Sequence, residues 1–363
     1  MSLINKKDNP YTLQFSYIPP KYIERRIATS DIIGNFTRSV PTYRGIFITG
    51  VRGSGKTVML GEIRNRMNEL KDWIAVDINP ENDLIHSLAN KLYRIPKLKT
   101  LFMEAKLDFS AMGFGVHIEN ADLVAYSDDD VLEMMLGALK KKGRKVLVTI
   151  DEITYSEDVA KFSHALSSYA SEDYDIYVLM TGLKENIDKI KNKPSLTFLY
   201  RAKEYEMDML NITAISADYQ KTLMISPEEA GRLAFESKGY SLAYQAMGYV
   251  YWDALADVGS VDNINKAEVY MQLDSILAEL AYDKICEELS SKDIAVLKAV
   301  SRLMRENDTD SVKVEDVRRE VNMTSETFAT YRKRLIDSGI IDGKQYGFLR
   351  YRLPRFEKYV KLK

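Results

Sequence analysis

The chain is poor in the residues on which redox and transition-metal chemistry depend. Its 363 residues include one cysteine, Cys286, and three histidines. A single cysteine excludes an intrachain disulfide framework and a cysteine-based zinc site. His86, His117 and His164 are scattered along the chain with no metal-ligand spacing. Cys286 lies in a helical stretch with no histidine nearby, so neither a metal hydrolase nor a serine or cysteine nucleophile has support.

Long apolar runs are also missing. No stretch reaches the roughly 18 consecutive apolar residues of a membrane-spanning helix, and the first residues are too polar for a signal peptide. Hydrophobic content of 45% and charged content of 29% are typical of a globular protein. We therefore expect a cytoplasmic protein with no membrane partner. The length of 363 residues predicts two or three domains.

Charge is distributed unevenly along the chain. The formal net charge is −2, but Ser291 to Lys363 carry 17 Lys and Arg against 11 Asp and Glu. The rest of the chain is correspondingly acidic. A basic C-terminal segment on an acidic body indicates a polyanionic partner for that segment, although an excess of this size also occurs on ordinary protein surfaces.

The phosphate-loop pattern G-x-x-x-x-G-K-[ST] is complete at residues 50–57. A short apolar run, Gly45–Thr49, precedes it as a buried strand would, and apolar residues follow at helical spacing. Glycines let successive N–H groups turn toward a phosphate, and the helix N-terminus adds a positive dipole. Lys56 would reach the β- and γ-phosphates, and the Thr57 hydroxyl would hold Mg²⁺. The predicted nucleotide contacts are Gly50, Val51, Arg52, Gly53, Ser54, Gly55, Lys56, Thr57 and Val58.

A second apolar run, Lys145–Ile150, ends in two carboxylates, Asp151 and Glu152. Ligands bind at the carboxyl edge of a parallel sheet, so both acids are expected beside the phosphates. We expect Asp151 to hold the Mg²⁺ shell through water, beside Thr57, and Glu152 to orient and deprotonate the attacking water. The alternative is that the two acids cap the following helix, which the complete loop makes the weaker interpretation.

Two further candidates rest on position alone. Thr181 ends another predicted buried strand, where its hydroxyl would contact the γ-phosphate or position the water, and a turn or capping role is equally compatible. Arg201 precedes a strand predicted at Glu204–Leu210. It would act either as a finger on a neighbouring subunit's phosphate or in a surface ion pair.

The periodicity of the chain changes twice. Residues 1–210 carry the strands, with an alternation at Leu107–Ile118 that predicts a β-hairpin insertion. Residues 211–289 show only helical periodicity and predict a helical lid, with Ser241 as the N-cap of one helix. Residues 290–363 read as three helices and two short strands. The predicted fold class is α/β: a P-loop NTPase core with a parallel sheet, an all-helical lid and a C-terminal winged-helix domain.

In a winged helix, the third helix fits the major groove and cations of the hairpin meet phosphate. The third predicted helix runs from Ser325 to Asp337, with its apolar residues on one face. The predicted DNA-binding residues on its other face and in the hairpin are Thr327, Thr330, Lys333, Arg334 and Arg350. A winged helix that docks a protein instead of DNA is the alternative.

These motifs together resemble the AAA+ class of P-loop ATPases, in the branch of archaeal-type, replication-initiator and STAND-like signalling ATPases. Residues 50–57 match its Walker A motif and Val146–Glu152 match Walker B. Thr181 stands at the sensor-1 position and Arg201 at the arginine-finger position. The sequence around Lys238–Ser241 also looks like that of a widespread group of bacterial ATP-binding proteins.

The resemblance implies two more features of the nucleotide site. In ATPases of this type the lead-in segment often lies over the base, so Tyr22 and Ile23 are adenine-pocket candidates, with ordinary packing as the alternative. The lid motif of this branch usually reads Gly-x-Pro, but Ser241 stands in place of the proline. Ser241–Trp252 also contains no arginine, where relatives carry a sensor-2 arginine, so slow turnover is expected.

The predicted function is that of a protein that binds ATP and hydrolyses it with Mg²⁺. Its ATP or ADP state would control a winged helix that binds duplex DNA. The first alternative is a nucleotide-gated switch whose winged helix docks a protein partner. The second is a ring-forming homo-oligomer in which Arg201 acts between subunits.

Overall fold

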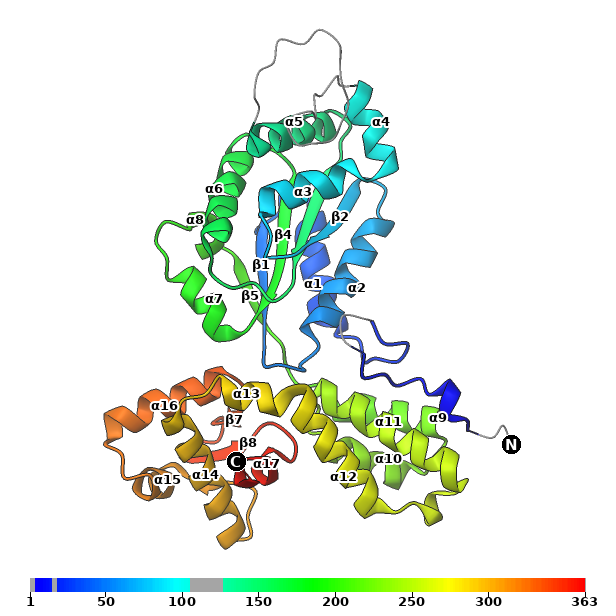
Figure 1. The fold of residues 1–363 in the computed structure, drawn as a ribbon, viewed down its shortest axis with the longest axis vertical. Coiled ribbons are helices and arrows are strands. Elements are labelled where there is room, and N and C mark those ends of the chain that lie inside the picture. The colour runs from blue at the N-terminus through cyan, green and yellow to red at the C-terminus, as the bar shows by residue number, and fades with distance from the viewer. Residues whose placement is uncertain (1–3, 15–17, 105–126, 363) are drawn as a thin grey trace. The chain divides into compact units, whose positions relative to one another are not determined.

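The structure is a computed structural model that describes residues 4–14, 18–104 and 127–362 (Figure 1). The chain divides into two compact units. Unit 1 comprises Met1–Glu24, Gly50–Gly55 and Met207–Lys363, and unit 2 comprises Arg25–Thr49 and Lys56–Glu206. The hairpin predicted at Leu107–Ile118 lies outside the described residues. Within the described part of the chain, no helix combines the length and apolar character needed to span a membrane.

Unit 2 is built on a five-stranded parallel sheet. Its strands, in spatial order, are β2 (Trp73–Ile78), β3 (Lys145–Ile150), β4 (Ile176–Gly182), β1 (Gly45–Thr49) and β5 (Lys203–Glu206). Strands β1 and β4 are buried along their whole length, as expected for continuous apolar runs in a parallel sheet. Because all strands run the same way, their carboxyl ends meet at one edge.

Strand β5 is shorter than the sequence predicted. It ends at Glu206 rather than at Leu210. The Leu210 N–H donates to the carbonyl oxygen of Gly239 at 2.7 Å, and Leu210 is buried in the core of unit 1. The backbone after Glu206 therefore bonds to unit 1 rather than continuing the sheet ladder.

Helices cover both faces of the sheet of unit 2. Helix α2 packs on β2, β3 and β4, with α1 against it, while α3, α5 and α6 pack together over the opposite face (Figure 1). A core of apolar side chains fills the space beneath α3, α5 and α6. The helices of this unit are α1 (Arg26–Thr37), α2 (Lys56–Glu69), α3 (Leu84–Tyr93), α4 (Pro96–Glu104), α5 (Asp128–Lys141), α6 (Glu157–Ser171), α7 (Lys184–Lys191) and α8 (Thr197–Tyr200).

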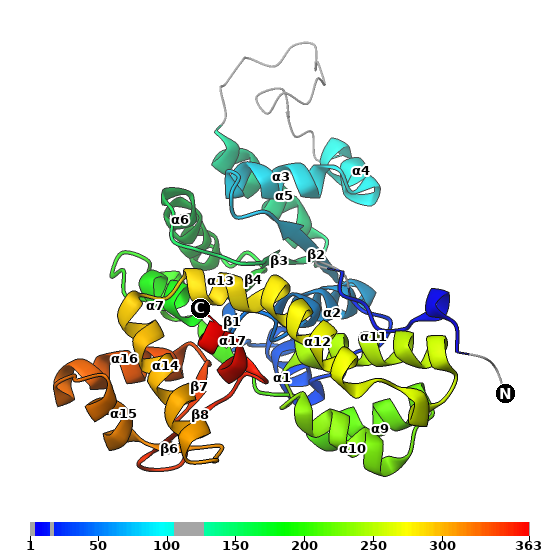
Figure 2. The ribbon, with the colours of Figure 1, turned by 60° about the horizontal axis from the view of Figure 1, so that its bottom comes forward.

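Unit 1 contains residues 211–289, the segment predicted as a helical lid and called the lid below, and its elements are helices. Helix α9 packs along α10, and α11 packs along α12, which Figure 2 shows from a second direction. The chain then passes through a π-helical turn, η4, into the short helix α13. The elements are α9 (Ile212–Leu223), α10 (Pro227–Glu236), α11 (Ser241–Val258), η3 (Val261–Asn263), α12 (Lys266–Leu277), η4 (Ala278–Tyr282) and α13 (Asp283–Glu287).

The N-terminal segment, with its short 3₁₀ turn η1 (Lys6–Asp8), is part of the lid core. Tyr11 is 1% exposed and packs edge-on against Tyr219 and Tyr244. Its hydroxyl donates to Asp218 at 2.7 Å. Its ring lies so close to α11 that a Cβ at Gly248 would come within 2.6 Å of it. A glycine is therefore required there by space rather than by backbone conformation.

The C-terminal domain of unit 1 has the predicted three helices and hairpin, and two elements that were not predicted, β6 and α17. Strand β8 lies between β6 and β7 in an antiparallel sheet. The elements are α14 (Ser291–Glu306), β6 (Val312–Lys313), α15 (Val314–Glu320), α16 (Ser325–Asp337), β7 (Ile341–Asp342), β8 (Phe348–Tyr351) and α17 (Phe356–Leu362).

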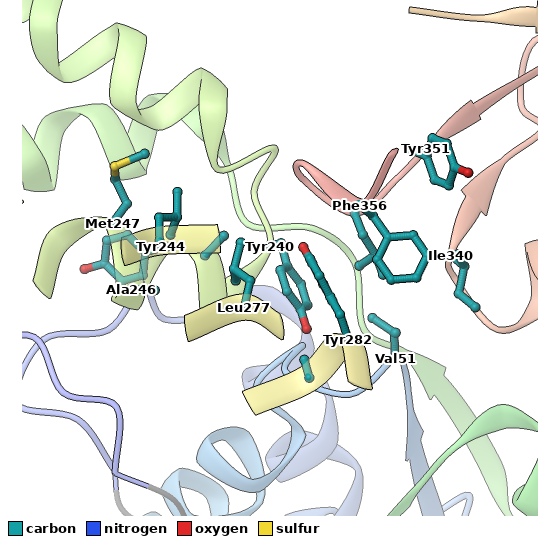
Figure 3. Close-up of a cluster of buried hydrophobic side chains, with 14 of the residues drawn as sticks. Val51, Tyr240, Tyr244, Ala246, Met247, Leu277, Tyr282, Ile340, Tyr351 and Phe356 are labelled. Carbon is teal, nitrogen blue, oxygen red and sulfur yellow. The ribbon is translucent and has the colours of Figure 1, made fainter. Parts of the chain in front are cut away.

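One continuous apolar core joins the lid to the C-terminal domain. The ring of Tyr282 stacks on Tyr240 with centroids 6.4 Å apart and meets the ring of Phe356 edge-on at 4.7 Å (Figure 3). All three side chains are fully buried. Lid and C-terminal domain therefore share a core.

Candidate nucleotide-binding site

In unit 2, Asp151 follows the last residue of β3, next to Thr181 near the end of β4. The register that pairs Ile150 with Met180 brings the two side chains together. Asp151 accepts hydrogen bonds from the hydroxyls of Thr57 and Thr181, the first with an oxygen–oxygen distance of 2.7 Å. The predicted Walker B acid, Asp151, and the threonine that ends the phosphate-loop pattern, Thr57, are thus in direct contact.

The Thr181 hydroxyl is engaged on both sides. It donates to Asp151 and accepts from the backbone N–H of Glu152 at 3.0 Å, while its own carbonyl accepts from the N–H of Ile153 at 2.8 Å. Thr181 is fully buried. These contacts make Thr181 a residue that positions the two acids.

The backbone of Glu152 is in the left-handed region, with φ at 53°. For a residue with a Cβ this conformation costs about 1–2 kcal/mol relative to ordinary helical geometry. The two hydrogen bonds from its N–H, to the Asp151 carboxylate and the Thr181 hydroxyl, hold it there. The Glu152 side chain is exposed. Strain at this residue fits a carboxylate that must project from the strand end.

The oxygens of Thr57 and Asp151 fit a shared magnesium shell. A hydroxyl and a carboxylate are oxygen donors of the kind that Mg²⁺ prefers, and these two lie within hydrogen-bond distance of each other at 2.7 Å. Within the described residues, no group of three or more His, Cys, Asp or Glu could hold a metal. Mg²⁺ usually takes one or two protein oxygens and completes its shell with water and phosphate.

The loop of residues 50–55 belongs to unit 1 and leads directly into α2, whose first residue is Lys56. Gly53 has φ at +72° and Gly55 has φ at +92°, conformations that only glycine adopts without strain. Lys56 is 7% exposed. A glycine-rich turn that opens a helix in this way presents backbone N–H groups to an anion.

The carbonyl side of the loop contacts the start of α11. The Tyr240 hydroxyl donates to the Arg52 carbonyl at 2.5 Å, the Ser241 hydroxyl to the Ser54 carbonyl at 2.7 Å, and the Leu242 N–H to the Gly53 carbonyl at 3.0 Å. Sequence analysis missed all three donors. The prediction of Ser241 as an N-cap was wrong, because Tyr240 occupies that position and Ser241 is the first residue of the helix. The one feature of the sequence that could have indicated such a contact was the serine at position 241 in place of the usual proline.

Arg201 lies near the amino ends of the strands in the sheet of unit 2, whereas Asp151 lies at their carboxyl ends. It directly follows α8, two residues before Lys203, which pairs with Ile46 near the start of β1. Together with Arg44 it lines a pocket of about 540 Å³. A phosphate bound beside Asp151 would be out of its reach, so a finger role would have to be played on another copy.

The adenine-pocket candidates lie in the N-terminal segment of unit 1. Ile23 packs against the core of that unit, and Tyr22 is half-buried. The preceding carbonyl, that of Lys21, accepts a hydrogen bond from Gln245 of α11. Val58, the last predicted nucleotide contact, is in the first turn of α2 and half-buried.

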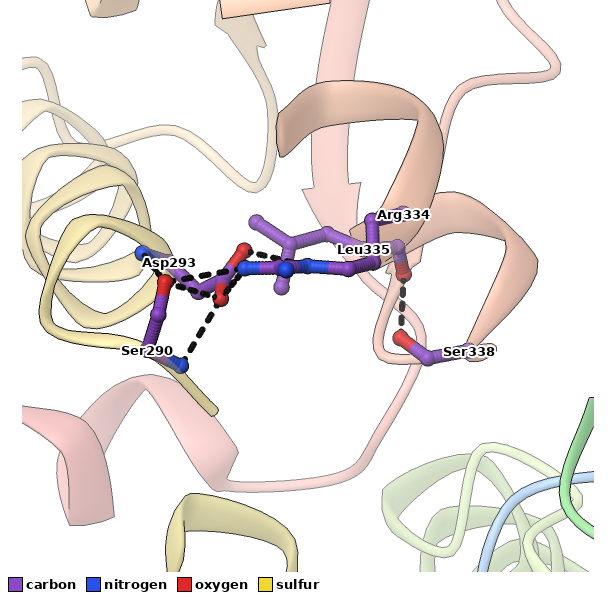
Figure 4. Close-up of polar contacts among 5 residues, drawn as sticks. All are labelled: Ser290, Asp293, Arg334, Leu335 and Ser338. Atoms are coloured by element: carbon purple, nitrogen blue, oxygen red, sulfur yellow. Dashed lines mark hydrogen bonds and ion pairs between the residues drawn. The ribbon is translucent and has the colours of Figure 1, made fainter. Parts of the chain in front are cut away.

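The predicted DNA-binding residues differ in their surroundings. Arg334 points into the domain, where its guanidinium pairs with Asp293, which is fully buried, and donates to Ser290 at 2.8 Å (Figure 4). The Arg334 side chain is still 43% exposed, so the ion pair does not remove it from the outward face predicted for it. Arg350 pairs with Asp342 at 2.9 Å. Burial alone would raise the pKa of the Asp342 carboxyl, but the N–H of Lys344 and this arginine together lower it.

The remaining candidates are on α16. Lys333 and Thr330 are exposed, and the Thr330 hydroxyl donates to the carbonyl of Glu326 at 3.2 Å. Thr327 is half-buried and accepts a hydrogen bond from the Thr324 hydroxyl at 3.0 Å. Lys333 and Arg334 are thus both exposed, and Arg334 is the one of the two with an ion-pair partner described above.

Comparison with known proteins identifies the fold. A family model described as a domain of unknown function, DUF8462, matches residues 279–360. No curated protein matches the chain. The solved ADPNP-ADP complexes of the Aeropyrum pernix ORC2 protein are 14% identical with a TM-score of 0.62, covering 96% of this chain and 95% of that one. The Cdc6p of Pyrobaculum aerophilum is 14% identical with a TM-score of 0.50, at 96% and 95% coverage.

At this level of identity the likeness concerns the fold alone. The five-stranded parallel sheet with the order β2-β3-β4-β1-β5, flanked by helices, is that of the AAA+ P-loop NTPases. The class of fold predicted from the sequence is confirmed.

Proposed function

We propose that this protein binds ATP with Mg²⁺ and hydrolyses it. The observation that carries the proposal is the contact of Asp151 with Thr57 and with Thr181. Asp151 and Thr181 lie at strand ends, and Thr57 lies on the helix that begins directly after a complete phosphate loop. The ORC2 structure with this fold was solved with ADPNP and ADP. Both the donor set and the fold therefore fit a nucleotide.

Different residues of the site would bind the phosphates, hold the magnesium ion and accept the proton. The N–H groups of the loop at Gly53 and Gly55 and the Lys56 ammonium would hold the phosphates. Thr57 and Asp151 would hold Mg²⁺, which when bound neutralises charge on the β- and γ-phosphates. Glu152, exposed next to Asp151, would accept the proton of the attacking water.

Two substitutions test the nucleotide proposal. Lys56→Ala should abolish binding of MgATP, because the buried ammonium is the main counter-charge of the loop. Glu152→Gln should keep binding and stop hydrolysis. Hydrolysis at the wild-type rate by Glu152→Gln would show that another group is the base. Lys161→Ala, an exposed lysine on α6, is the control and should change neither property.

We further propose that the C-terminal domain is a winged helix controlled by the nucleotide state. Helix, strand, helix, helix and two strands, α14 to β8, are in the order of a winged helix. The shared core with the lid would transmit a change at the nucleotide to this domain. Lys333 on α16 and Lys344 in the hairpin turn are exposed and would meet the phosphates of duplex DNA.

The DNA proposal is tested by affinity for a mixed-sequence duplex as salt is varied, with and without an ATP analogue. Binding should weaken steeply with salt, and Lys333→Ala with Lys344→Ala should reduce the slope by about two. Lys298→Ala with Lys358→Ala removes the same charge from α14 and α17 as a control. Affinity that is independent of salt, or equal loss in both pairs, would refute the DNA role.

The second candidate is a protein-docking role for the same domain. It is favoured by the ion pairs of Arg334 with Asp293 and of Arg350 with Asp342, which leave these guanidiniums less charge to offer a phosphate. It predicts no salt-dependent duplex binding and a bound protein that changes with the nucleotide. A ring in which Arg201 acts between copies predicts assembly that depends on ATP.

A further inference from the structure

Three consecutive residues of the lid meet three consecutive carbonyls of the phosphate loop. Tyr240, Ser241 and Leu242 donate to the carbonyl oxygens of residues 52, 54 and 53 at 2.5, 2.7 and 3.0 Å. All six residues lie within unit 1. The row of contacts covers the carbonyl side of the loop, which is the side turned away from a ligand held by its N–H groups.

The peptide bond relates these carbonyls to the groups that would bind phosphate. In a trans peptide the C=O and the N–H of the next residue lie in one plane and point in opposite directions. Fixing the carbonyls of residues 52, 53 and 54 therefore fixes the direction of the N–H groups of residues 53, 54 and 55. A hydrogen bond accepted at the carbonyl also polarises the peptide and strengthens its N–H as a donor.

We propose that Tyr240, Ser241 and Leu242 are positioning residues that hold the N–H groups of Gly53 and Gly55 in the direction required by a phosphate. The N–H of Ser54, between them, donates to the Val51 carbonyl at 3.2 Å and so adds to the fixed shape of the loop. The inference rests on the proposed nucleotide function. Without these donors the loop would have to be ordered by the nucleotide itself, and binding would be weakened by that cost.

The surroundings of Tyr240 support a rigid contact. Tyr240 is 0% exposed and its ring is stacked on Tyr282, so the hydroxyl cannot swing away. Burial raises the pKa of Tyr240, which keeps the hydroxyl protonated and therefore a donor. A Cβ at Gly53 would lie 2.2 Å from the Tyr240 hydroxyl oxygen. The close approach thus requires glycine independently of its positive φ.

The contact also completes helix α11. Among the described residues, the side chain of Tyr240 makes no capping bond to this helix. Leu242 is the second residue of α11, and its N–H would otherwise be one of the four without a partner in the helix. The Gly53 carbonyl supplies that partner. Loop and helix therefore depend on each other for hydrogen bonds.

The test is the Kd for MgADP of the full chain carrying Tyr240→Phe or Ser241→Ala. Each variant removes one hydroxyl and keeps the rest of the side chain. We expect each to weaken binding on the order of tenfold, and the double variant by more than either. Hydrogen exchange of residues 50–57 in the nucleotide-free protein should become faster in the same variants.

The matched controls lose a similar hydrogen bond elsewhere in unit 1. The Tyr219 hydroxyl is buried and donates to the Tyr244 carbonyl at 2.7 Å, and the Ser301 hydroxyl donates to the Glu357 carbonyl at 2.7 Å. Tyr219→Phe and Ser301→Ala should lower thermal stability to a similar extent and leave both the Kd and the exchange of the loop unchanged. A restored Kd in Ser241→Thr, which keeps the hydroxyl, would support the role of that group.

The outcomes separate this inference from the nucleotide proposal. If the wild type binds MgADP and both variants bind it equally well, the positioning role is wrong. It is also wrong if the controls weaken binding as much as the variants do. If the wild type binds no nucleotide, the proposed function fails, and the exchange of the loop in the variants still decides whether the lid holds it.

Discussion

Asp151 and the loop of residues 50–55 are held by different kinds of contact. Asp151 follows a buried strand, and its neighbour Thr181 is brought alongside by the register of a parallel ladder. The carbonyls of the loop are held by Tyr240, Ser241 and Leu242, at the start of a lid helix. The acids are thus placed by the register of the sheet and by the Thr181 hydroxyl, whereas the carbonyls of the loop accept from donors of the lid.

This contrast predicts that substitutions among the acids change the chemistry, while substitutions at the lid contact change affinity. The largest effect is expected for Asp151→Asn. The amide removes the charge from the magnesium shell and disturbs the bonds from Thr57 and Thr181. ATP hydrolysis should fall by about a hundredfold, and added Mg²⁺ should no longer improve the Kd. Asp158→Asn on α6 is the control, and an Asp151→Asn protein whose affinity still depends on Mg²⁺ would contradict the assignment.

Thr181→Val should have a smaller effect, on hydrolysis rather than on binding. It removes the hydroxyl that bridges Asp151 and the N–H of Glu152. We expect kcat to fall about tenfold with the Kd for nucleotide changed by less than about threefold. Thr149→Val is a matched control, because the Thr149 hydroxyl is also buried and donates to a carboxylate, that of Asp77, at 2.8 Å. A tenfold loss of affinity in Thr181→Val would erase the proposed contrast.

Glu152→Gly should increase stability and abolish activity. Glycine relieves the left-handed backbone at φ 53° and should raise the free energy of unfolding by up to about 1 kcal/mol, with hydrolysis lost. Asp173→Gly, at φ 58° after α6, should give a similar gain with hydrolysis kept. Urea unfolding measures both. Lower stability of Glu152→Gly would mean that the side chain contributes more than the strain costs.

The smallest effect is expected for Glu288→Gln. The pair of Arg52 with Glu288, at 2.8 Å, joins the loop to the end of the lid, but both side chains are about one-third or more exposed. Such a pair contributes about 1 kcal/mol or less, so the Kd for MgADP should change less than about threefold. A tenfold change would indicate that charge holds the loop, contrary to the role given to the carbonyl contacts.

Contacts between sequence neighbours or between strand ends could be predicted from the sequence. The apolar run before Asp151 and the run before Thr181 each predict a buried strand, and parallel strands bring their ends to one edge. That reasoning placed both residues at the same edge as the helix carrying Thr57. It did not give the sheet order, in which β4 lies between β1 and β3.

Contacts between distant side chains could not be predicted in this way. Ser241 and Ser54 are 187 positions apart, and no periodicity relates them. For Arg334, helical spacing predicted an outward side chain, which is 43% exposed, but it could not predict the ion pair with the buried Asp293, 41 positions away. Strand β5 was predicted too long because the alternation of acidic and apolar residues continues past Glu206. The backbone N–H of Leu210 instead donates to the carbonyl of Gly239 in unit 1.

The insertion of Tyr11 against Gly248 has a practical consequence for work with this protein. The ring fills a gap that α11 has no side chain of its own to fill, so trimming the chain from its beginning to residue 12 would leave a hole in the lid. Cavities of that kind are destabilising in proportion to their volume. Versions shortened in this way are therefore poor substitutes for the full chain in binding assays.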